Sequence, residues 1–241
     1  MDQVFYEKLT NVCHDLLSQN KQLRVYLKNR GITKQTIDDY KLGAFPTDLR
    51  CLFDKLSAQE LRNRVIVYQA DKSPFLQYPL VIPIRDASGQ PVAIGCRTLL
   101  SEEERKKLGL PKYRNSVYSK TSHLFGLDRA IHDIRKSNKV YGVEGYFDCI
   151  TAHQDGMKNL VASCGTLFSS RQLTILSRYT DRVCILFDND EAGKINAQIV
   201  KDKFADNGFV TISCALTPNK YKDLDEYLTH GGSLDYFDLE F

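Results

Sequence analysis

Three short acidic groups in the second half of the chain carry the side chains best suited to chemistry. They are Glu144 with Asp148, Asp188 with Asp190, and Asp223 with Asp225. Carboxylates that crowd together repel one another and raise each other's pKa, and a bound divalent cation removes that repulsion. Hard carboxylate oxygens suit Mg²⁺ or Mn²⁺ rather than zinc. Two such ions activate an attacking hydroxyl, stabilise a leaving oxygen and hold phosphate between them.

Strands alternate with helices around these acidic groups. Apolar runs predict strands and helical spacing predicts helices, with strands at 139–143, 160–163, 183–188 and 210–216 and helices at 147–154, 170–179 and 192–206. This alternation implies right-handed crossovers and a mostly parallel sheet. Sites in such sheets lie beyond the carboxyl ends of the strands, which is where Glu144 and Asp188 fall.

The acidic and glycine features also have plain structural interpretations. An Asp-x-Asp sequence at a helix start, such as Asp188 and Asp190, serves as a cap and as a partner of the helix dipole. Glu144 at a second strand tip favours convergence on a metal instead. Gly165 and Thr166 offer unhindered amides and a hydroxyl to a ligand, but a turn or packing role for the glycine is equally open.

The first half of the chain predicts an irregular, cationic α+β region. Helices are expected at 3–18, 21–29 and 33–40, and strands at 65–69, 80–85 and 92–98, with a turn at 86–89 joining the last two strands as a hairpin. Residues 1–138 hold 23 Lys and Arg against 15 Asp and Glu, a net charge of +8, whereas residues 139–241 carry −5. A basic half suits a polyanion, although two ordinary solvated faces also explain the split.

The composition is that of an ordinary globular protein of 241 residues, 42% hydrophobic and 26% charged. It excludes collagen-like, coiled-coil and wholly disordered chains. No apolar run approaches the roughly 18 residues that span a bilayer, and the first residues lack a secretory pattern. The seven cysteines include no Cys-x-x-Cys pair, so no zinc is expected. We expect a cytoplasmic protein with no membrane partner.

The order of motifs resembles the TOPRIM fold of primases, topoisomerases and nucleases. The resemblance rests on 144–148, on Gly165 with Thr166, and on 188–193. It implies an α/β fold in which a TOPRIM-type, mostly parallel sheet flanked by helices occupies 139–241. A basic mixed α+β subdomain at 1–138 precedes it.

The first half resembles the RNA-polymerase core of bacterial DnaG-type primases. The matching stretches are 26–32, 61–66, 82–86, 95–97, 111–116 and 120–127. The resemblance implies DNA-dependent synthesis of short RNA primers on single-stranded DNA, by metal-assisted nucleotidyl transfer from nucleoside triphosphates.

The same resemblance assigns roles to the acidic residues. It implies that Asp188 and Asp190 bind two or more Mg²⁺ or Mn²⁺ ions, with further oxygens from Asp223 and Asp225. Glu144 is then a metal ligand or general base, and Asp148 is its catalytic neighbour.

Basic and polar residues are expected to hold nucleotide phosphates or template. They are Arg62, Arg64, Arg97, Lys112, Asn115 and Lys120, joined by Gly165 and Thr166. Arg grips phosphate bidentately and Lys acts as a point charge. Tyr113, between two cations, is suited to stack on a base or ribose. Solvated surface charge is the alternative interpretation for the basic residues.

Two other functions stay open at this point. One is a TOPRIM nuclease that cuts nucleic acid at the same metal site, and the other is a non-catalytic nucleic-acid-binding module. The chain lacks the cysteine and histidine set of a zinc module and ends soon after the third acidic group. The chain is then either a minimal core that uses a replicative helicase or a separate zinc-binding subunit in trans, or an excised catalytic fragment.

Overall fold

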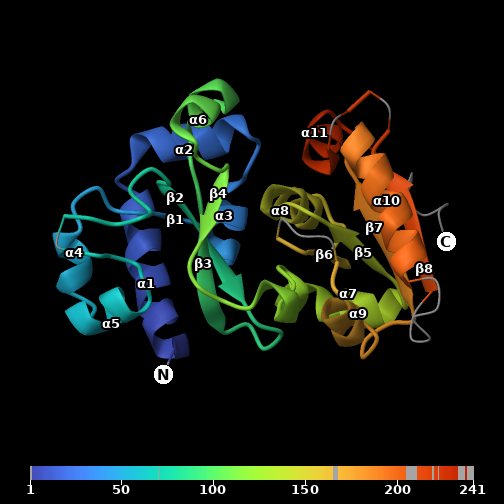
Figure 1. The fold of residues 1–241 in the computed structure, drawn as a ribbon, viewed down its shortest axis with the longest axis horizontal. Helices are drawn as coiled ribbons and strands as arrows, with labels where there is room; N and C mark the ends of the chain where they lie inside the picture. The colour runs from blue at the N-terminus through green and yellow to red at the C-terminus, as the bar shows by residue number, and fades with distance from the viewer. Residues whose placement is uncertain are drawn as a thin grey trace. The chain divides into compact units, whose positions relative to one another are not determined.

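The computed structural model describes residues 2–69, 71–164, 168–204, 211–218, 220–221, 223–232 and 237. The chain folds into two compact units (Figure 1). Unit 1 comprises 1–85 and 90–118, and unit 2 comprises 86–89 and 119–241. Among the described residues, no helix combines the length and the apolar character that crossing a bilayer demands.

Unit 1 is built on a four-stranded antiparallel sheet in the order β1-β2-β3-β4. Its strands are β1 (Gly43–Ala44), β2 (Leu80–Arg85), β3 (Pro91–Arg97) and β4 (Tyr113–Asn115). Its helices are α1 (Asp2–Leu17), α2 (Lys21–Asn29), α3 (Lys34–Tyr40), α4 (Arg50–Phe53), α5 (Ala58–Asn63) and α6 (Glu102–Leu108). The expected hairpin of β2 and β3 is confirmed, as are the first three helices.

Helix α1 lies along the sheet of unit 1 and fixes its two ends. Near the start of α1, Arg85 at the end of β2 approaches Glu7 at 3.9 Å. Toward the other end of α1, Gly43 of β1 lies so close to Cys13 that a Cβ at residue 43 would come within 2.8 Å of the Cys13 Cβ. The core between them is apolar and includes Phe5, Leu9 and Ile94.

The prediction of a strand at 65–69 is wrong. Val65 has a positive φ of 56° directly after α5, and Tyr68 and Lys72 close a small loop through an N–H···O bond of 2.7 Å. Ile66 and Val67 are nonetheless fully buried. A β-branched run has therefore been packed into the core as a loop, so its apolar character gave no information about its backbone.

Unit 2 contains a four-stranded parallel sheet, which confirms the mostly parallel sheet that the sequence predicts. Its strand order is β6-β5-β7-β8. Its strands are β5 (Val140–Val143), β6 (Leu160–Ala162), β7 (Arg182–Phe187) and β8 (Thr211–Leu216). Its helices are α7 (Leu127–Ser137), α8 (Tyr146–Gln154), α9 (Ser170–Leu176), α10 (Glu191–Phe204) and α11 (Leu224–Thr229), preceded by a 3₁₀ turn at Lys120–Ser122.

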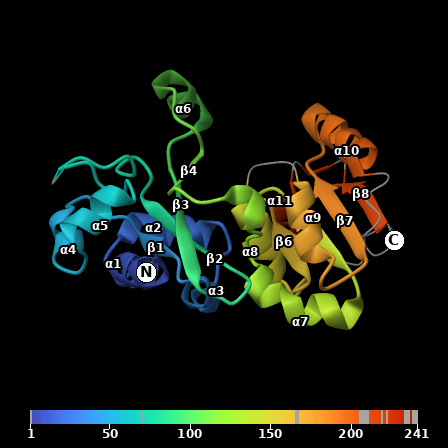
Figure 2. The same ribbon diagram turned by 60° about the horizontal axis from the view of Figure 1, so that its bottom comes forward.

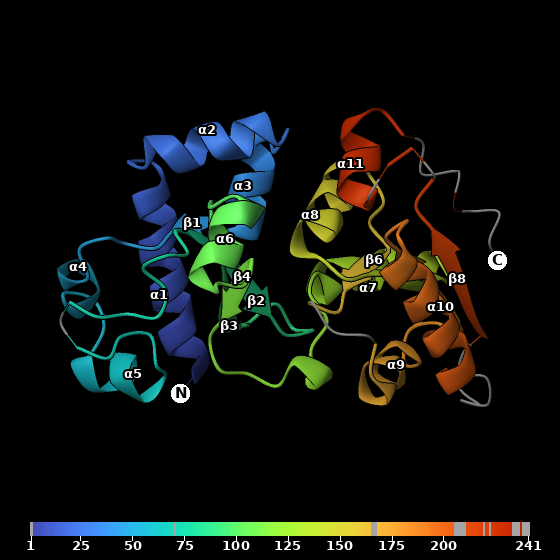
Figure 3. The same ribbon diagram turned by 45° about the horizontal axis from the view of Figure 1, so that its top comes forward.

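The strand order of unit 2 reverses between β5 and β7. The chain leaves β5 toward β6 and later leaves β7 toward β8, on the other side. Right-handed crossovers then place α8 on one face of the sheet and α9 and α10 on the other. Apolar residues of α7, α9 and α10 share one core cluster with the strands, and α8 packs against α11 and β6 (Figures 2 and 3). A reversal of this kind opens a crevice at the carboxyl ends of the two central strands.

The compact units divide near residue 118, whereas the division by charge lies at residue 138. Helix α7 lies between these two positions, and it packs in the core of unit 2 through Ala130 and Ile134. The division at 138 describes a change in charge and motif, and its functional meaning stays a prediction.

Candidate functional site

The acidic groups follow the strands and begin the helices of unit 2. Glu144 comes directly after β5, and Asp188 comes directly after β7. These are the two central strands at which the strand order reverses. The sequence-based location of the site at the carboxyl edge of the sheet therefore agrees with the topology.

Asp190 and Asp223 both cap helices. Asp190 Oδ1 accepts the Gly193 N–H at 2.7 Å at the start of α10, and Asp223 Oδ1 accepts the Glu226 N–H at 2.8 Å at the start of α11. The interpretation of Asp190 as a helix cap is thus correct for one of its two carboxylate oxygens. It does not compete with a metal role, because a carboxylate has two oxygens and several lone pairs.

Asp148 lies at the centre of the acidic groups. Burial raises its pKa from 3.8 to about 7, helped by the nearby carboxylates of Asp223, Asp225 and Asp188. Its Oδ1 accepts the main-chain N–H of Asp225 at 3.2 Å. Carboxylates of the other two acidic groups therefore act on the Asp148 side chain and raise its pKa.

Glu144 lies near another acidic residue, Asp190. Burial raises the pKa of Glu144, the Asp190 charge adds to that effect, and a hydrogen bond from Asn196 Nδ2 at 3.5 Å opposes it. Asn196 belongs to α10. It is a polar neighbour that sequence reasoning missed, although its position two turns into the helix after Asp190 was a usable signal.

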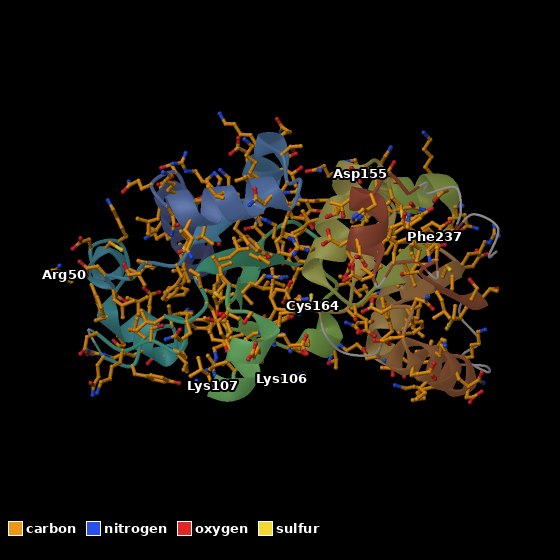
Figure 4. All side chains as sticks on the ribbon, turned by 90° about the horizontal axis from the view of Figure 1, so that it is seen from above. Arg50, Lys106, Lys107, Asp155, Cys164 and Phe237 are labelled. Carbon is orange, nitrogen blue, oxygen red and sulfur yellow. The ribbon has the colours of Figure 1, made fainter. Side chains whose placement is uncertain are left out.

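Asp225 is buried, at 8% exposed, whereas the other five residues of the acidic groups are half-buried or exposed. Its Oδ1 accepts the hydroxyl of Thr151 at 2.5 Å, and the Thr229 hydroxyl donates to its main-chain oxygen. Burial chiefly raises the pKa of Asp155, at the end of α8 and marked in Figure 4, with a small contribution from Asp225. Sequence reasoning missed Thr151, which lies three residues after Asp148 on the same helix face.

The donor set fits a hard divalent cation. The donors are carboxylate oxygens drawn from three chain segments, and their mutual repulsion is visible at Asp148. Within the described ranges, no three His, Cys, Asp or Glu side chains are arranged as a ready-made ligand cage. Mg²⁺ does not need one, because it keeps several waters and binds through one or two carboxylates together with substrate phosphates.

The predicted basic residues fall into separate places. Arg62, Arg64, Arg97, Lys112 and Asn115 belong to unit 1, and Lys120 belongs to unit 2, where its main-chain oxygen accepts the Gln172 amide at 3.1 Å. The Arg64 guanidinium lies 4.3 Å from the ring centroid of Phe5, near the start of α1. Arg97 contacts α2, which follows the other end of α1. Unit 1 therefore does not bring these arginines into direct contact.

Arg97 is the centre of an aromatic and cationic cluster in unit 1. Its Nη1 donates to the Tyr113 hydroxyl at 2.6 Å, and its guanidinium lies 5.6 Å from the ring centroid of Tyr26 and 5.2 Å from that of Tyr113. Lys112 lies 5.8 Å from the Tyr113 ring and is itself exposed. Arg30 Nη1 donates to the Tyr26 hydroxyl at 3.3 Å. We name Tyr26, Arg30, Arg97, Lys112 and Tyr113 the Arg97 cluster. Stacked Arg and Tyr side chains beside exposed Lys are suited to single-stranded nucleic acid.

The remaining predicted residues are less informative. Arg62 is exposed on α5, and Asn115 is half-buried at the end of β4, opposite Gly95. Gly165 and Thr166 lie outside the described residues. Lys106 and Lys107 are exposed on α6, where Lys106 pairs with Glu102 at 2.7 Å (Figure 4).

Known proteins match both parts of the chain. Residues 12–131 match the family described as the N-terminal domain of the DNA primase catalytic core, and residues 141–228 match a Toprim-like family. The DNA primase of Aquifex aeolicus is 31% identical over 204 residues, which cover 80% of this chain and 40% of that protein. The chain belongs to the DnaG-type DNA primase family.

Solved primase structures have a similar fold. The Aquifex aeolicus primase, solved with its zinc-binding and RNA polymerase domains, gives a TM-score of 0.84 at 28% identity, covering 98% of this chain and 59% of that one. The RNA polymerase domain of Mycobacterium tuberculosis DnaG primase, in complex with a double-stranded DNA oligomer with a 6-nucleotide overhang, gives 0.78 at 26%, covering 95% and 76%. Toprim primases are metal-dependent, generally with Mg²⁺. The chain spans about 40% of the Aquifex relative's length.

Proposed function

We propose that this chain is the catalytic core of a primase that makes short RNA primers on single-stranded DNA. The observation that carries the proposal is the gathering of acidic residues from three segments around Asp148, at the carboxyl edge of a parallel sheet. The chain's membership of the DnaG-type family supplies the reaction class.

The reaction is nucleotidyl transfer. The 3′-hydroxyl of the growing RNA loses its proton and attacks the α-phosphate of a nucleoside triphosphate, and pyrophosphate leaves with the electrons of the broken P–O bond. Bound divalent ions, held by Asp188 and Asp190 with further oxygens from Asp223 and Asp225, would supply charge neutralisation to the phosphates. The protein contributes positioning and electrostatics rather than a covalent nucleophile.

Glu144 and Asp148 are proposed to work beside these ligands. Glu144 is a ligand or the general base that takes the hydroxyl proton, and burial raises its pKa, which makes it a better proton acceptor. Asp148 shares its surroundings with all three acidic groups and is proposed to hold their spacing.

The nucleic-acid side of the proposal rests on unit 1. The Arg97 cluster combines cations with tyrosine rings and is proposed to hold the single-stranded template. Arg62, Arg64, Asn115, Lys120, Gly165 and Thr166 are proposed to contact nucleotide phosphates or template. A mycobacterial relative has been solved with DNA that carries an overhang, which supports DNA as the partner. Nucleoside triphosphates, a helicase or zinc-binding subunit in trans, and a cytoplasmic location complete the proposal.

One assay tests the proposed function. The full chain is incubated with single-stranded DNA, Mg²⁺ or Mn²⁺, and ribonucleotides of which one is labelled. Short labelled RNA that disappears in the Asp188→Asn, Asp190→Asn double variant supports a primase. A shortened template without labelled product identifies a nuclease and overturns the proposal, as does DNA binding with neither product. Labelled RNA that survives the double substitution contradicts the proposed metal ligands.

A further inference from the structure

Helices α8 and α11 are joined by two hydrogen bonds on one face of α8. Asp148 and Thr151 are three residues apart, so their side chains lie on the same face one turn apart. Asp148 Oδ1 accepts the main-chain N–H of Asp225 at 3.2 Å, and the Thr151 hydroxyl donates to Asp225 Oδ1 at 2.5 Å. One acidic residue is thus fixed through both its main chain and its side chain.

The Thr151 hydroxyl lies in an enclosed place. Thr151 is 2% exposed and Asp225 is 8% exposed, so water has little access to the bond between them. A buried carboxylate without a donor is costly, and a donor to one oxygen also fixes the rotation of the carboxylate plane. Thr151 offers one hydroxyl donor and no charge, so it orients Asp225 without adding a competing cation to the site.

We propose that Thr151 is a positioning residue that sets the orientation of the Asp225 carboxylate for divalent-metal binding. The inference rests on the proposed function, because it takes Asp225 as one of the metal-binding oxygens. Groups that hydrogen-bond to ligating carboxylates typically change metal affinity or activity by 10- to 100-fold when they are removed. Thr151 therefore acts on the metal through Asp225 and does not touch it.

The test measures Mn²⁺ affinity of the full chain by the electron paramagnetic resonance signal of free Mn²⁺. Thr151→Val keeps the shape of the side chain and removes the donor, and we expect roughly tenfold weaker binding. Thr151→Ser keeps the donor and should bind Mn²⁺ as the wild type does. Equal affinity in the Val variant, or equal loss in the Ser variant, overturns the proposal.

A matched control separates this role from general stability. Thr180 is 5% exposed, and its hydroxyl donates to the main-chain oxygen of Arg182 and accepts the Arg182 N–H. These bonds lie at the start of β7, at the opposite end of the strands from the acidic groups. Thr180→Val should lower the melting temperature and leave Mn²⁺ affinity unchanged. If Thr151 were only structural, Thr151→Val would behave in the same way, which would overturn the proposal. Thr151→Ala removes the same donor and replaces the Val variant if that variant does not fold.

A double-mutant cycle shows whether Thr151 acts through Asp225. Asp225→Asn keeps an oxygen that accepts the Thr151 hydroxyl but loses the charge. We expect Thr151→Val to weaken Mn²⁺ binding in the wild type and to have little further effect in the Asp225→Asn background. Independent, multiplying losses overturn the proposal. A wild-type chain that binds no Mn²⁺ overturns the proposed function itself, whereas normal wild-type binding with no Thr151 effect overturns this inference alone.

Discussion

Replacing Asp148 by Asn should stabilise the metal-free protein, and more so at high pH. The folded state raises the pKa of Asp148 from 3.8 to about 7, because its burial and the carboxylates of Asp223, Asp225 and Asp188 disfavour the charged form. An acid with a raised pKa holds its proton longer in the folded state than in the unfolded state. Stability is therefore lost as pH rises from about 4 to about 7.

The magnitude follows from that shift. With one pKa unit equal to about 1.4 kcal/mol, the cost of ionising Asp148 in the folded protein is about 2 kcal/mol at pH 5 and about 4 kcal/mol at pH 8. The free energy of unfolding of Asp148→Asn, minus that of the wild type, should thus rise by roughly 2–3 kcal/mol between these pH values. Taking the difference removes contributions that both proteins share.

The assay is urea unfolding followed by circular dichroism, with EDTA present, at pH 5, 6, 7 and 8. Asp202→Asn is the control for the loss of a carboxylate, because Asp202 is exposed on α10. Adding Mg²⁺ at pH 8 should stabilise the wild type, by about 2.7 kcal/mol at one hundred times Kd. A pH-independent difference for Asp148→Asn would refute the electrostatic account of the site.

Three further predictions test other parts of the structure. Burial lowers the pKa of His153 from 6.5 to about 4, so this side chain is neutral in the folded protein. The free energy of unfolding should therefore fall as pH drops below 6.5, by about 2 kcal/mol at pH 5. His153→Gln keeps a donor to the Leu160 oxygen, and in urea unfolding it should flatten this pH dependence. In fluorescence anisotropy, Arg97→Ala should weaken binding to single-stranded DNA and reduce the slope of log K against log salt by about 0.7. Replacing the exposed Lys106 by Ala should change neither quantity. Equal effects of the two substitutions would contradict the role of the Arg97 cluster. Gly193→Ala should destabilise the protein by about 3 kcal/mol, because the added Cβ would overlap the main-chain oxygen of Asp188; a melting temperature equal to that of the wild type would contradict this packing.

The sequence predicts unit 2 better than unit 1 because strands and helices alternate regularly there. Each parallel strand is an apolar run followed by a helical pattern, and crossover handedness then determines the topology. A capping box of Ser169 and Gln172 begins α9. Helix α7 had no assignment from the sequence, although its apolar residues Ala130 and Ile134 recur at helical spacing.

Unit 1 shows where local pattern fails. The 65–69 run has strand-like residues, but Val65 adopts a left-handed conformation and the Ser73 hydroxyl holds the Ile66 oxygen at 2.6 Å. The Ser73 hydroxyl belongs to the loop at 71–79, which also buries Phe75 and Tyr78 in the core. A contact made by the loop that follows leaves no periodic trace in residues 65–69 themselves.

The candidate site divides in the same way. The rule for the carboxyl ends of parallel strands placed Glu144 and Asp188 at one end of the sheet, because that rule depends only on local geometry. The roles of Thr151 and Asn196 were not foreseen, since each depends on a partner brought close by the fold: Asp225 lies 74 residues from Thr151, and Glu144 lies 52 residues from Asn196. A threonine or asparagine in a helix carries no sign of such a partner.

The most direct test of the acidic site is a crystal of this protein soaked in Mn²⁺, examined for anomalous scattering. The account predicts a strong peak within coordination distance of carboxylate oxygens from at least two of the three acidic groups, Asp188 with Asp190 among them. Side chains that point apart with no peak beside them, or a peak bound only elsewhere on the chain, would contradict the account.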